Sequence, residues 1–231
     1  MPAIERVSTG IGGLDQLLQG GLPAERSILL SGAAGTGKTI YGLNFLWNGL
    51  VQGENGAFIS MGAESKEKLI EKGAQVGLDL APHFDSGDLS YHHLNPERDD
   101  IQFFNKVNEI VTRQEVDRIV IDSLSVMLGE QEGDEAVKRK QMYKLDRNLQ
   151  NAEATTIMTA ELQENNPSYL SRYGVAEHVV DGVIRLEYSG VGEESFRQVE
   201  VRKMEGTDHA SGKFSFIISD DGISVRAHTG L

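Results

Sequence analysis

The chain has 231 residues, of which 39% are apolar and 25% charged, proportions typical of a water-soluble protein large enough to bury a core. Its formal net charge of −13 argues against a general nucleic-acid coat, because such proteins carry a surplus of basic residues. Cysteine is absent, which excludes disulfides, thiolate zinc sites and cysteine nucleophiles. With no basic start before an apolar run and no long apolar stretch, we expect no signal peptide, no membrane span and a cytoplasmic location.

Predicted helices and strands alternate over the first two thirds of the chain. A glycine-rich turn at residues 8–13 opens a short helix at 14–18, which glycines and a proline at 20–23 close. Apolar runs predict strands at residues 27–31, 57–61, 118–122 and 154–160. Apolar residues at helical spacing predict helices at residues 41–51, 65–76, 101–112 and 134–152. Residues 79–99 are expected to form a loop around one short strand near 89–94.

Two of these helices carry more detailed predictions. Ser65 is the expected N-cap of the helix at 65–76. In the helix at 134–152, the side chains expected to face inward are those of Val137, Met142, Leu145 and Leu149.

The last third of the chain consists of strands and short turns. The predicted strands are at residues 183–188, 196–202, 213–218 and 223–226. The sequence Asp-Asp-Gly at 220–222 is typical of a hairpin turn. Strands that alternate with helices form parallel sheets. We therefore expect an α/β fold with a mainly parallel central sheet flanked by helices, extended by C-terminal antiparallel strands, as one domain over residues 1–231.

Residues 32–39, GAAGTGKT, match the pattern G-x-x-x-x-G-K-[ST] of a phosphate-binding P-loop. The glycines permit a tight turn that points backbone N–H groups at a phosphate chain, and the following helix would direct its N-terminus there. Lys38 would reach the β- and γ-phosphates of ATP, and the Thr39 hydroxyl would bind Mg²⁺. The alternative is a glycine-rich turn that binds nothing. The residues expected to bind the nucleotide are Gly35, Thr36, Gly37, Lys38, Thr39 and Ile40.

Three carboxylates follow predicted strands. Asp122 occupies the Walker B place, where a carboxylate holds Mg²⁺ through water, although an aspartate there could also cap the next helix. A hydrolase needs a further group to orient the attacking water. Glu64 is one candidate, or else a solvated residue ahead of the helix at 65–76, and Glu161 is a second candidate in the same layer. The expected catalytic set is Lys38, Glu64 and Asp122.

Two other features are interpreted as structural. The adjacent residues His92 and His93 would face opposite ways on a strand, so we expect no metal site there. The basic residues at 138–140 are interspersed with acidic ones, which favours a solvated helix face.

Several motifs together resemble the KaiC-like branch of the RecA superfamily. They are the P-loop and residues 8–15, 20–23, 45–49, 121–124, 172–177, 181–183, 201–209 and 218–223, so the resemblance covers nearly the whole chain. It implies a RecA-like ATPase core that uses ATP and Mg²⁺, and a hexameric ring with ATP between neighbouring subunits.

The resemblance also implies residues that act on the neighbouring subunit. In KaiC-like domains a K-x-R-G-x-x-H segment reaches the next subunit's phosphates, and Lys203, Gly206 and His209 match it. Glu205 stands where the arginine would be. The family also has two adjacent glutamates after the second strand, whereas this chain has Ala63 followed by Glu64. Both departures imply slow hydrolysis. The implied contacts with the neighbour's nucleotide are Lys203, Met204, Glu205, Thr207, His209, Ser219 and Asp220.

The expected function is therefore that of an ATP-binding, slowly hydrolysing protein that forms rings and acts as a nucleotide-dependent switch or signalling ATPase for another protein. Two alternatives stay open: a recombination mediator that binds single-stranded DNA, and a scaffold that uses ATP only to assemble. The acidic charge and the lack of an aromatic and basic loop argue against DNA binding. Autophosphorylation is not assumed, because the chain resembles one KaiC domain only.

Overall fold

A computed structural model describes residues 4–96, 100–113, 115–129, 135–162, 169–190 and 196–226. The strands of the α/β core are β3 (Ser27–Gly32), β4 (Gly56–Ser60), β5 (Leu89–His93), β6 (Arg118–Asp122), β7 (Thr155–Ala160) and β8 (Gly182–Ser189). The tail adds β9 (Phe196–Met204), β10 (Lys213–Ser219) and β11 (Gly222–Arg226). Near the start of the chain, β1 (Arg6–Val7) and β2 (Leu22–Pro23) form a small antiparallel pair.

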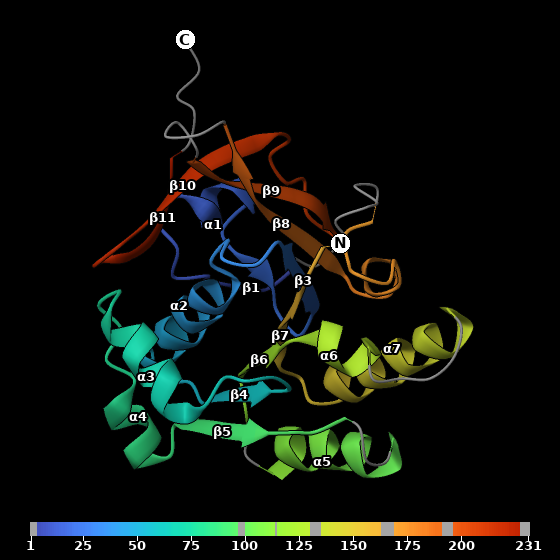
Figure 1. Ribbon diagram of the computed structural model, residues 1–231. Helices are drawn as coiled ribbons and strands as arrows, with labels where there is room; N and C mark the ends of the chain where they lie inside the picture. The colour runs from blue at the N-terminus through green and yellow to red at the C-terminus, as the bar shows by residue number, and fades with distance from the viewer. Residues whose placement is uncertain are drawn as a thin grey trace.

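The described strands β3 to β11 form one nine-stranded sheet in the order β11-β10-β9-β8-β3-β7-β6-β4-β5 (Figure 1). Neighbouring strands are parallel from β8 to β5 and antiparallel from β8 to β11. The hairpin between β10 and β11 closes on the pair Ser219 and Gly222, so Asp220 and Asp221 form its two-residue loop. The structure thus confirms the predicted α/β class with its antiparallel extension.

Helices cover both faces of the parallel sheet (Figure 1). The first core contains α1 (Leu14–Leu17), α2 (Lys38–Leu50) and α3 (Lys66–Ala74), and the second contains α5 (Asp100–Arg113), α6 (Leu124–Gly129) and α7 (Glu135–Gln150). Along β3, Ile28 and Leu30 belong to the first core and Leu29 to the second, because successive side chains of a strand point to opposite faces. This burial on both faces explains why the strands are continuous apolar runs.

Short elements account for most differences from the predicted elements. The predicted loop at 79–99 contains a helix, α4 (Ala81–Ser86), which starts with a proline in its first turn, a position that favours proline. The sequence did not predict α6, the 3-10 helix η1 (Ala176–His178), β1 or β2. Residues 97–99 of the predicted loop and residue 134, the predicted start of a helix, lie outside the described residues. Val137 is 40% exposed, so its predicted inward orientation is wrong.

The sheet brings the carboxyl ends of β3, β4, β6 and β7 to one edge. The P-loop, Glu64, Asp122 and Glu161 lie at or just after these ends. In open α/β sheets this edge is where ligands bind. The fold therefore assembles the predicted site residues from four separate segments.

Candidate functional site

The P-loop is held in shape by contacts within the chain. A side-chain carbon at Gly32 would lie 2.6 Å from the Thr36 hydroxyl and 2.7 Å from the Leu186 carbonyl, so only glycine fits. Gly35 and Gly37 have φ angles of 77° and 104°, a region that glycine adopts readily. The loop passes directly into α2, whose first residue is Lys38, so the free N–H groups of this helix belong to the P-loop region.

Lys38 lies over this loop. Its Nζ donates hydrogen bonds to the carbonyl oxygens of Gly32 at 2.8 Å and Ala33 at 2.9 Å. Burial lowers the pKa of Lys38, while the negative charges of Asp122 and Glu161 act in the opposite direction. The ammonium group thus has both carboxylates within electrostatic reach.

Asp122 lies at the end of β6, where two threonines hold its carboxylate. Oδ2 accepts a hydrogen bond from the Thr39 hydroxyl at 2.8 Å, and Oδ1 accepts one from the Thr159 hydroxyl at 2.6 Å. These bonds come from α2 and β7, so the carboxylate does not act as a cap of α6 in this arrangement. A carboxylate and a hydroxyl are hard oxygen donors that suit Mg²⁺, whose other ligands are phosphate oxygens and waters.

Glu64 follows β4 and lies in the same cleft. Its Oε1 accepts a hydrogen bond from Lys72 Nζ at 2.6 Å. Its backbone carbonyl accepts hydrogen bonds from the hydroxyls of Tyr91 at 2.6 Å and Ser60 at 3.0 Å. Oε2 is buried and has no hydrogen-bond partner among the described residues. Hydrogen bonds and an ion pair therefore fix Glu64 in the site, and it is not a freely solvated residue.

Glu161 follows β7 and also lines the cleft. Its backbone N–H donates to the Ser125 hydroxyl at 2.9 Å, and its carboxylate lies 3.4 Å from the Arg172 guanidinium. Both side chains of this ion pair are about half exposed. Glu161 is thus near Lys38 but is held less firmly than Glu64 or Asp122.

The cleft formed by these segments has a volume of about 670 Å³. Its lining includes residues of the tail that the sequence reasoning missed, Arg197 of β9 and Ile218 of β10. Arg197 lies over the ring of Tyr188, 5.2 Å from its centroid, and the Tyr188 hydroxyl donates to the Gly35 carbonyl at 2.8 Å. Arg197 Nε is buried without a hydrogen-bond partner among the described residues. No sequence pattern marks a single arginine in a strand as a site residue. Arg197 reaches the cleft because it pairs with Tyr188 across β8 and β9.

The segment at 203–209 lies away from this cleft. Met204 pairs with Gly182, which pairs with Ile28 near the start of β3, whereas the P-loop follows the other end of that strand. Lys203 Nζ donates to the Val180 carbonyl at 2.6 Å and lies 2.9 Å from the Glu205 carboxylate. These residues therefore do not line the cleft of their own chain.

The other members of this segment have local partners. The Met204 side chain is 5% exposed and packs in the first core, so only its backbone is available to a ligand. The Thr207 hydroxyl accepts a hydrogen bond from Arg6 at 2.6 Å, and His209 Nδ1 lies 3.2 Å from the Ala210 carbonyl.

Ser219 and Asp220 lie at the tip of the hairpin that carries Ile218. A side-chain carbon at Gly77 would lie 2.4 Å from the Asp220 carbonyl, and one at Gly37 would lie 2.8 Å from Ile218 Cδ1. The structure thus places both residues beside the cleft of their own chain. Their contact with a neighbour's nucleotide stays a prediction.

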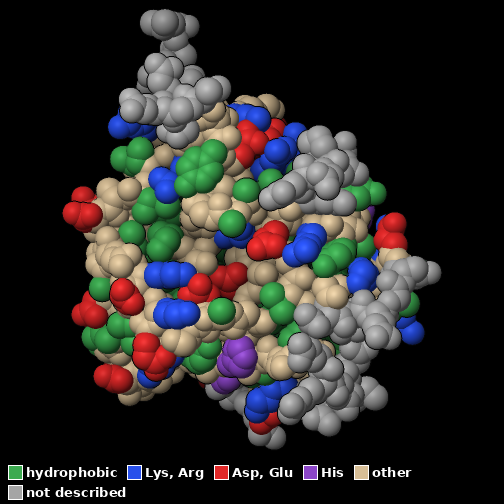
Figure 2. All heavy atoms as spheres, viewed as in Figure 1, with side chains coloured by type: hydrophobic (Ala, Val, Ile, Leu, Met, Phe, Trp, Pro, Cys, Tyr) green, Lys and Arg blue, Asp and Glu red, His purple; other side chains and the backbone are tan. Residues whose placement is uncertain are grey.

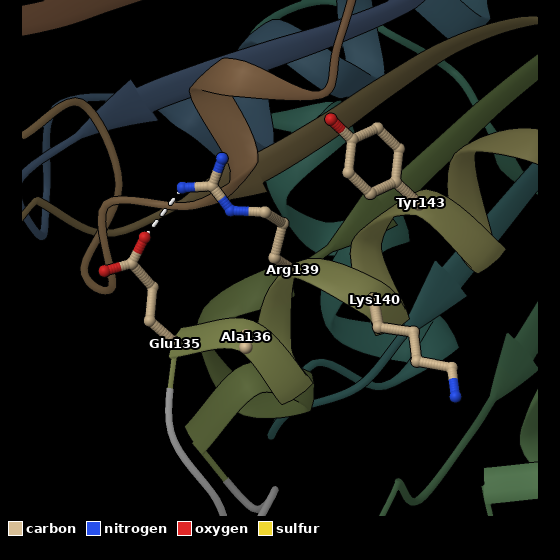
Figure 3. A pocket seen from close by; sticks show the side chains of 5 residues that line it. All are labelled: Glu135, Ala136, Arg139, Lys140 and Tyr143. Atoms are coloured by element: carbon tan, nitrogen blue, oxygen red, sulfur yellow. Dashed lines mark hydrogen bonds and ion pairs between the residues drawn. The ribbon is translucent and has the colours of Figure 1, made fainter.

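Outside this cleft, the described surface carries charges of both signs (Figure 2) and a further cavity. Figure 2 shows basic and acidic side chains close together near the middle of one face. A separate cavity of about 610 Å³ lies along α7 and is lined by Glu135, Ala136, Arg139, Lys140 and Tyr143. Glu135 and Arg139 form an ion pair at 2.7 Å, and Lys140 points away from them (Figure 3). Among the helices that the structure describes, none is long and apolar enough to cross a membrane.

Known proteins resemble this chain in sequence and fold. A family model for the KaiC ATPase matches residues 7–230. The circadian clock oscillator protein KaiC of Synechococcus elongatus is 33% identical over 96% of this chain, which spans only 44% of that protein. The UPF0273 protein MK0039 of Methanopyrus kandleri is 31% identical over 96% of this chain and 92% of its own length.

The structural comparison agrees. The crystal structure of the KaiC-like protein PH0186 of Pyrococcus horikoshii has a TM-score of 0.86 and 33% identity, and the match covers 97% of this chain and all of that one. This match confirms the expected RecA-like core. The family model and these relatives show that the chain belongs to the KaiC family of ATPases.

Proposed function

We propose that this chain binds Mg-ATP in the cleft at the P-loop and hydrolyses it slowly. The observation that carries the proposal is the meeting of Lys38, Thr39 and Asp122 at one edge of the sheet. Residues 35–40 would hold the phosphates, and Thr39 and Asp122 would hold Mg²⁺, which neutralises charge on the β- and γ-phosphates when bound. Arg197 lines the cleft, and its positive charge suits a further contact with an anion.

Two features support slow hydrolysis. Ala63 leaves Glu64 as the one glutamate of the pair that the family resemblance implies, so a single carboxylate orients the attacking water. Glu205, at the place of the finger arginine, forms an ion pair with Lys203 and so competes for the cation that would reach a neighbour's phosphates. Lysine also lacks the planar fork with which arginine binds phosphate oxygens.

The position of residues 203–209 supports assembly into a ring, for which we propose a hexamer. These residues lie near the start of β3, far along the sheet from their own P-loop, so they can serve a cleft only on another subunit. As one domain over residues 1–231, the chain would act as a nucleotide-dependent switch for a partner protein. The relatives named as clock oscillators are more than twice as long, so we propose no clock role and no autophosphorylation.

Nucleotide binding is tested by calorimetry with Mg-ATP on the wild type and on Lys38→Ala. We expect the variant to bind ATP much more weakly, because it loses the lysine's contact with the phosphates. Equal affinities would contradict the assignment of the site. Phosphate release, measured beside the elution volume with and without Mg-ATP, then tests hydrolysis and assembly.

The two alternative functions give different results in these measurements. A scaffold would change its elution volume with Mg-ATP but release no phosphate. A recombination mediator would bind single-stranded DNA with a sub-micromolar, salt-sensitive dissociation constant. We expect no such binding at physiological salt, because the net charge of −13 gives little attraction to phosphates.

A further inference from the structure

The cleft contains an ion pair that the sequence does not predict. Glu64 and Lys72 both line the cleft, and Lys72 Nζ lies 2.6 Å from Glu64 Oε1. Their side chains are 25% and 35% exposed, so the pair is partly shielded from water. Glu64 follows β4, whereas Lys72 lies in the last turn of α3. The pair therefore links the candidate water-orienting carboxylate to a helix that borders the cleft.

Hydrogen bonds fix the backbone on both sides of this ion pair. The Ser65 side chain caps α3 by accepting a hydrogen bond from the Lys68 backbone N–H at 3.3 Å. The hydroxyls of Tyr91 and Ser60 fix the Glu64 carbonyl. Both ends of the pair are thus anchored, and Lys72 defines the direction of the carboxylate between them. This direction leaves Oε1 on the lysine and Oε2 buried, without a hydrogen-bond partner in the described part of the chain.

We propose that Lys72 is a positioning residue for the hydrolysis of ATP, one that acts through Glu64. It holds the Glu64 carboxylate in one direction, the direction from which this carboxylate orients the attacking water. Because Ala63 offers no second carboxylate, the rate depends on this single, correctly oriented group. The proposal rests on the ATPase function proposed above.

A direct contact between Lys72 and a phosphate is the competing role, and it predicts different kinetics. A phosphate ligand contributes to affinity, so its loss weakens the binding of ATP. A positioning residue contributes to kcat and leaves ATP affinity unchanged. Its effect also disappears when Glu64 can no longer act, because the two residues then form one unit.

The experiment measures kcat and KM for ATP, together with the affinity for a non-hydrolysable ATP analogue, in six proteins. These are the wild type, Lys72→Met, Lys72→Arg, Lys68→Met, Glu64→Gln and the double variant Glu64→Gln/Lys72→Met. Lys68 is the matched control, because it lies one turn earlier on α3 and is exposed. Its Nζ donates a hydrogen bond to the Ala63 carbonyl at 3.1 Å.

We expect Lys72→Met to lower kcat roughly tenfold to a hundredfold with little change in analogue affinity. Lys72→Arg should recover most of the rate, since it restores the cation, and Lys68→Met should match the wild type. In the Glu64→Gln background, Lys72→Met should cause no further loss.

Several outcomes would overturn the proposal. An unchanged or raised kcat in Lys72→Met would remove the positioning role, and weaker analogue binding at unchanged kcat would make Lys72 a phosphate ligand. Additive losses in the double variant would show that Lys72 acts independently of Glu64. If the wild type binds Mg-ATP but releases no phosphate, both the proposed hydrolysis and the role of Lys72 are wrong. If the wild type hydrolyses ATP and Lys72→Met has the same kcat, only the role of Lys72 is wrong.

Discussion

Lys38 combines two opposed influences in one side chain. Burial, the larger of them, lowers its pKa from the ordinary value of 10.5, and the nearby carboxylates Asp122 and Glu161 raise it. A bound phosphate chain would add negative charge beside the ammonium group, so the pKa should be higher in the complex than in the free protein. Protons are then taken up when ATP binds at a pH near the lowered value.

The expected result is proton uptake on Mg-ATP binding that is small near neutral pH and larger at an alkaline pH closer to the ordinary lysine pKa of 10.5. Calorimetry in buffers of different ionisation enthalpy measures it. Lys38→Arg should bind without this uptake, because arginine stays protonated at both pH values. Lys68→Met, which changes an exposed lysine outside the cleft, should keep it. Identical uptake by the wild type and Lys38→Arg would show that another group takes up the proton.

At the scale of elements, Arg118 joins parts of the chain that are distant in sequence. It lies on β6, is 1% exposed, and pairs with Glu54, with Nε to Oε2 at 2.5 Å and a second bond at 3.0 Å. Its Nη1 donates to the carbonyls of Ser8, at 2.8 Å, and Phe45, at 2.9 Å. The guanidinium also lies 4.8 Å from the centroid of the Phe45 ring. This one side chain thus connects β6, α2 and the N-terminal segment.

Arg118→Met should lower the free energy of unfolding by about 3 kcal/mol, because it leaves a carboxylate and two carbonyls, that of Phe45 in a buried bond, without their donor. Urea denaturation measures the change. Arg139→Met is the control, since its ion pair with Glu135 is exposed, and it should cost less than about 1 kcal/mol. Equal losses in the two variants would show that the buried pair adds nothing beyond a surface one.

The main elements could be predicted from the sequence because their burial leaves a long pattern. Continuous apolar runs predicted β3, β4, β6 and β7, and Ser65 caps α3 as expected. The missed helices α4 and α6 span six residues each, less than two helical turns, which is too short to show a helical period. The strands β1 and β2 exist only because two distant segments pair.

The same reasoning explains which site residues were found. Lys38 belongs to a motif with fixed spacing, and Asp122 ends an apolar strand in the Walker B place, so their approach could be expected. Lys72 and Arg197 enter the cleft through the direction of α3 and the register of β8 with β9, which no local pattern specifies.

At the scale of the whole molecule, two groups of candidate site residues lie at opposite ends of the strands of the sheet. One edge carries the P-loop and its carboxylates, and the segment at 203–209 lies by the start of β3. Within one subunit these ends do not meet, so in the proposed ring the segment at 203–209 would serve the cleft of a neighbour. The rate of hydrolysis per subunit should therefore rise with protein concentration, as subunits assemble.

Glu205→Arg tests this arrangement directly. The substitution removes the carboxylate paired with Lys203 and adds a planar cation where negative charge develops in the transition state. We expect turnover to rise by at least about tenfold under conditions where rings form, less than the full effect of an arginine finger because Ala63 still lacks a carboxylate. ATPase rate against protein concentration measures the gain, and the gain should vanish at concentrations where elution volume shows single subunits.

Glu205→Gln separates the two contributions of that substitution, since it frees Lys203 without adding a cation. An intermediate rate would show that the ion pair restrains Lys203, and a rate equal to wild type would assign the whole gain to the new arginine. If Glu205→Arg is no faster when rings are present, the segment at 203–209 does not reach the neighbouring cleft, or the lone glutamate limits the rate. Adding Glu64→Gln to the variant tests the role of Glu64 itself, because an unchanged rate would remove that carboxylate from the mechanism.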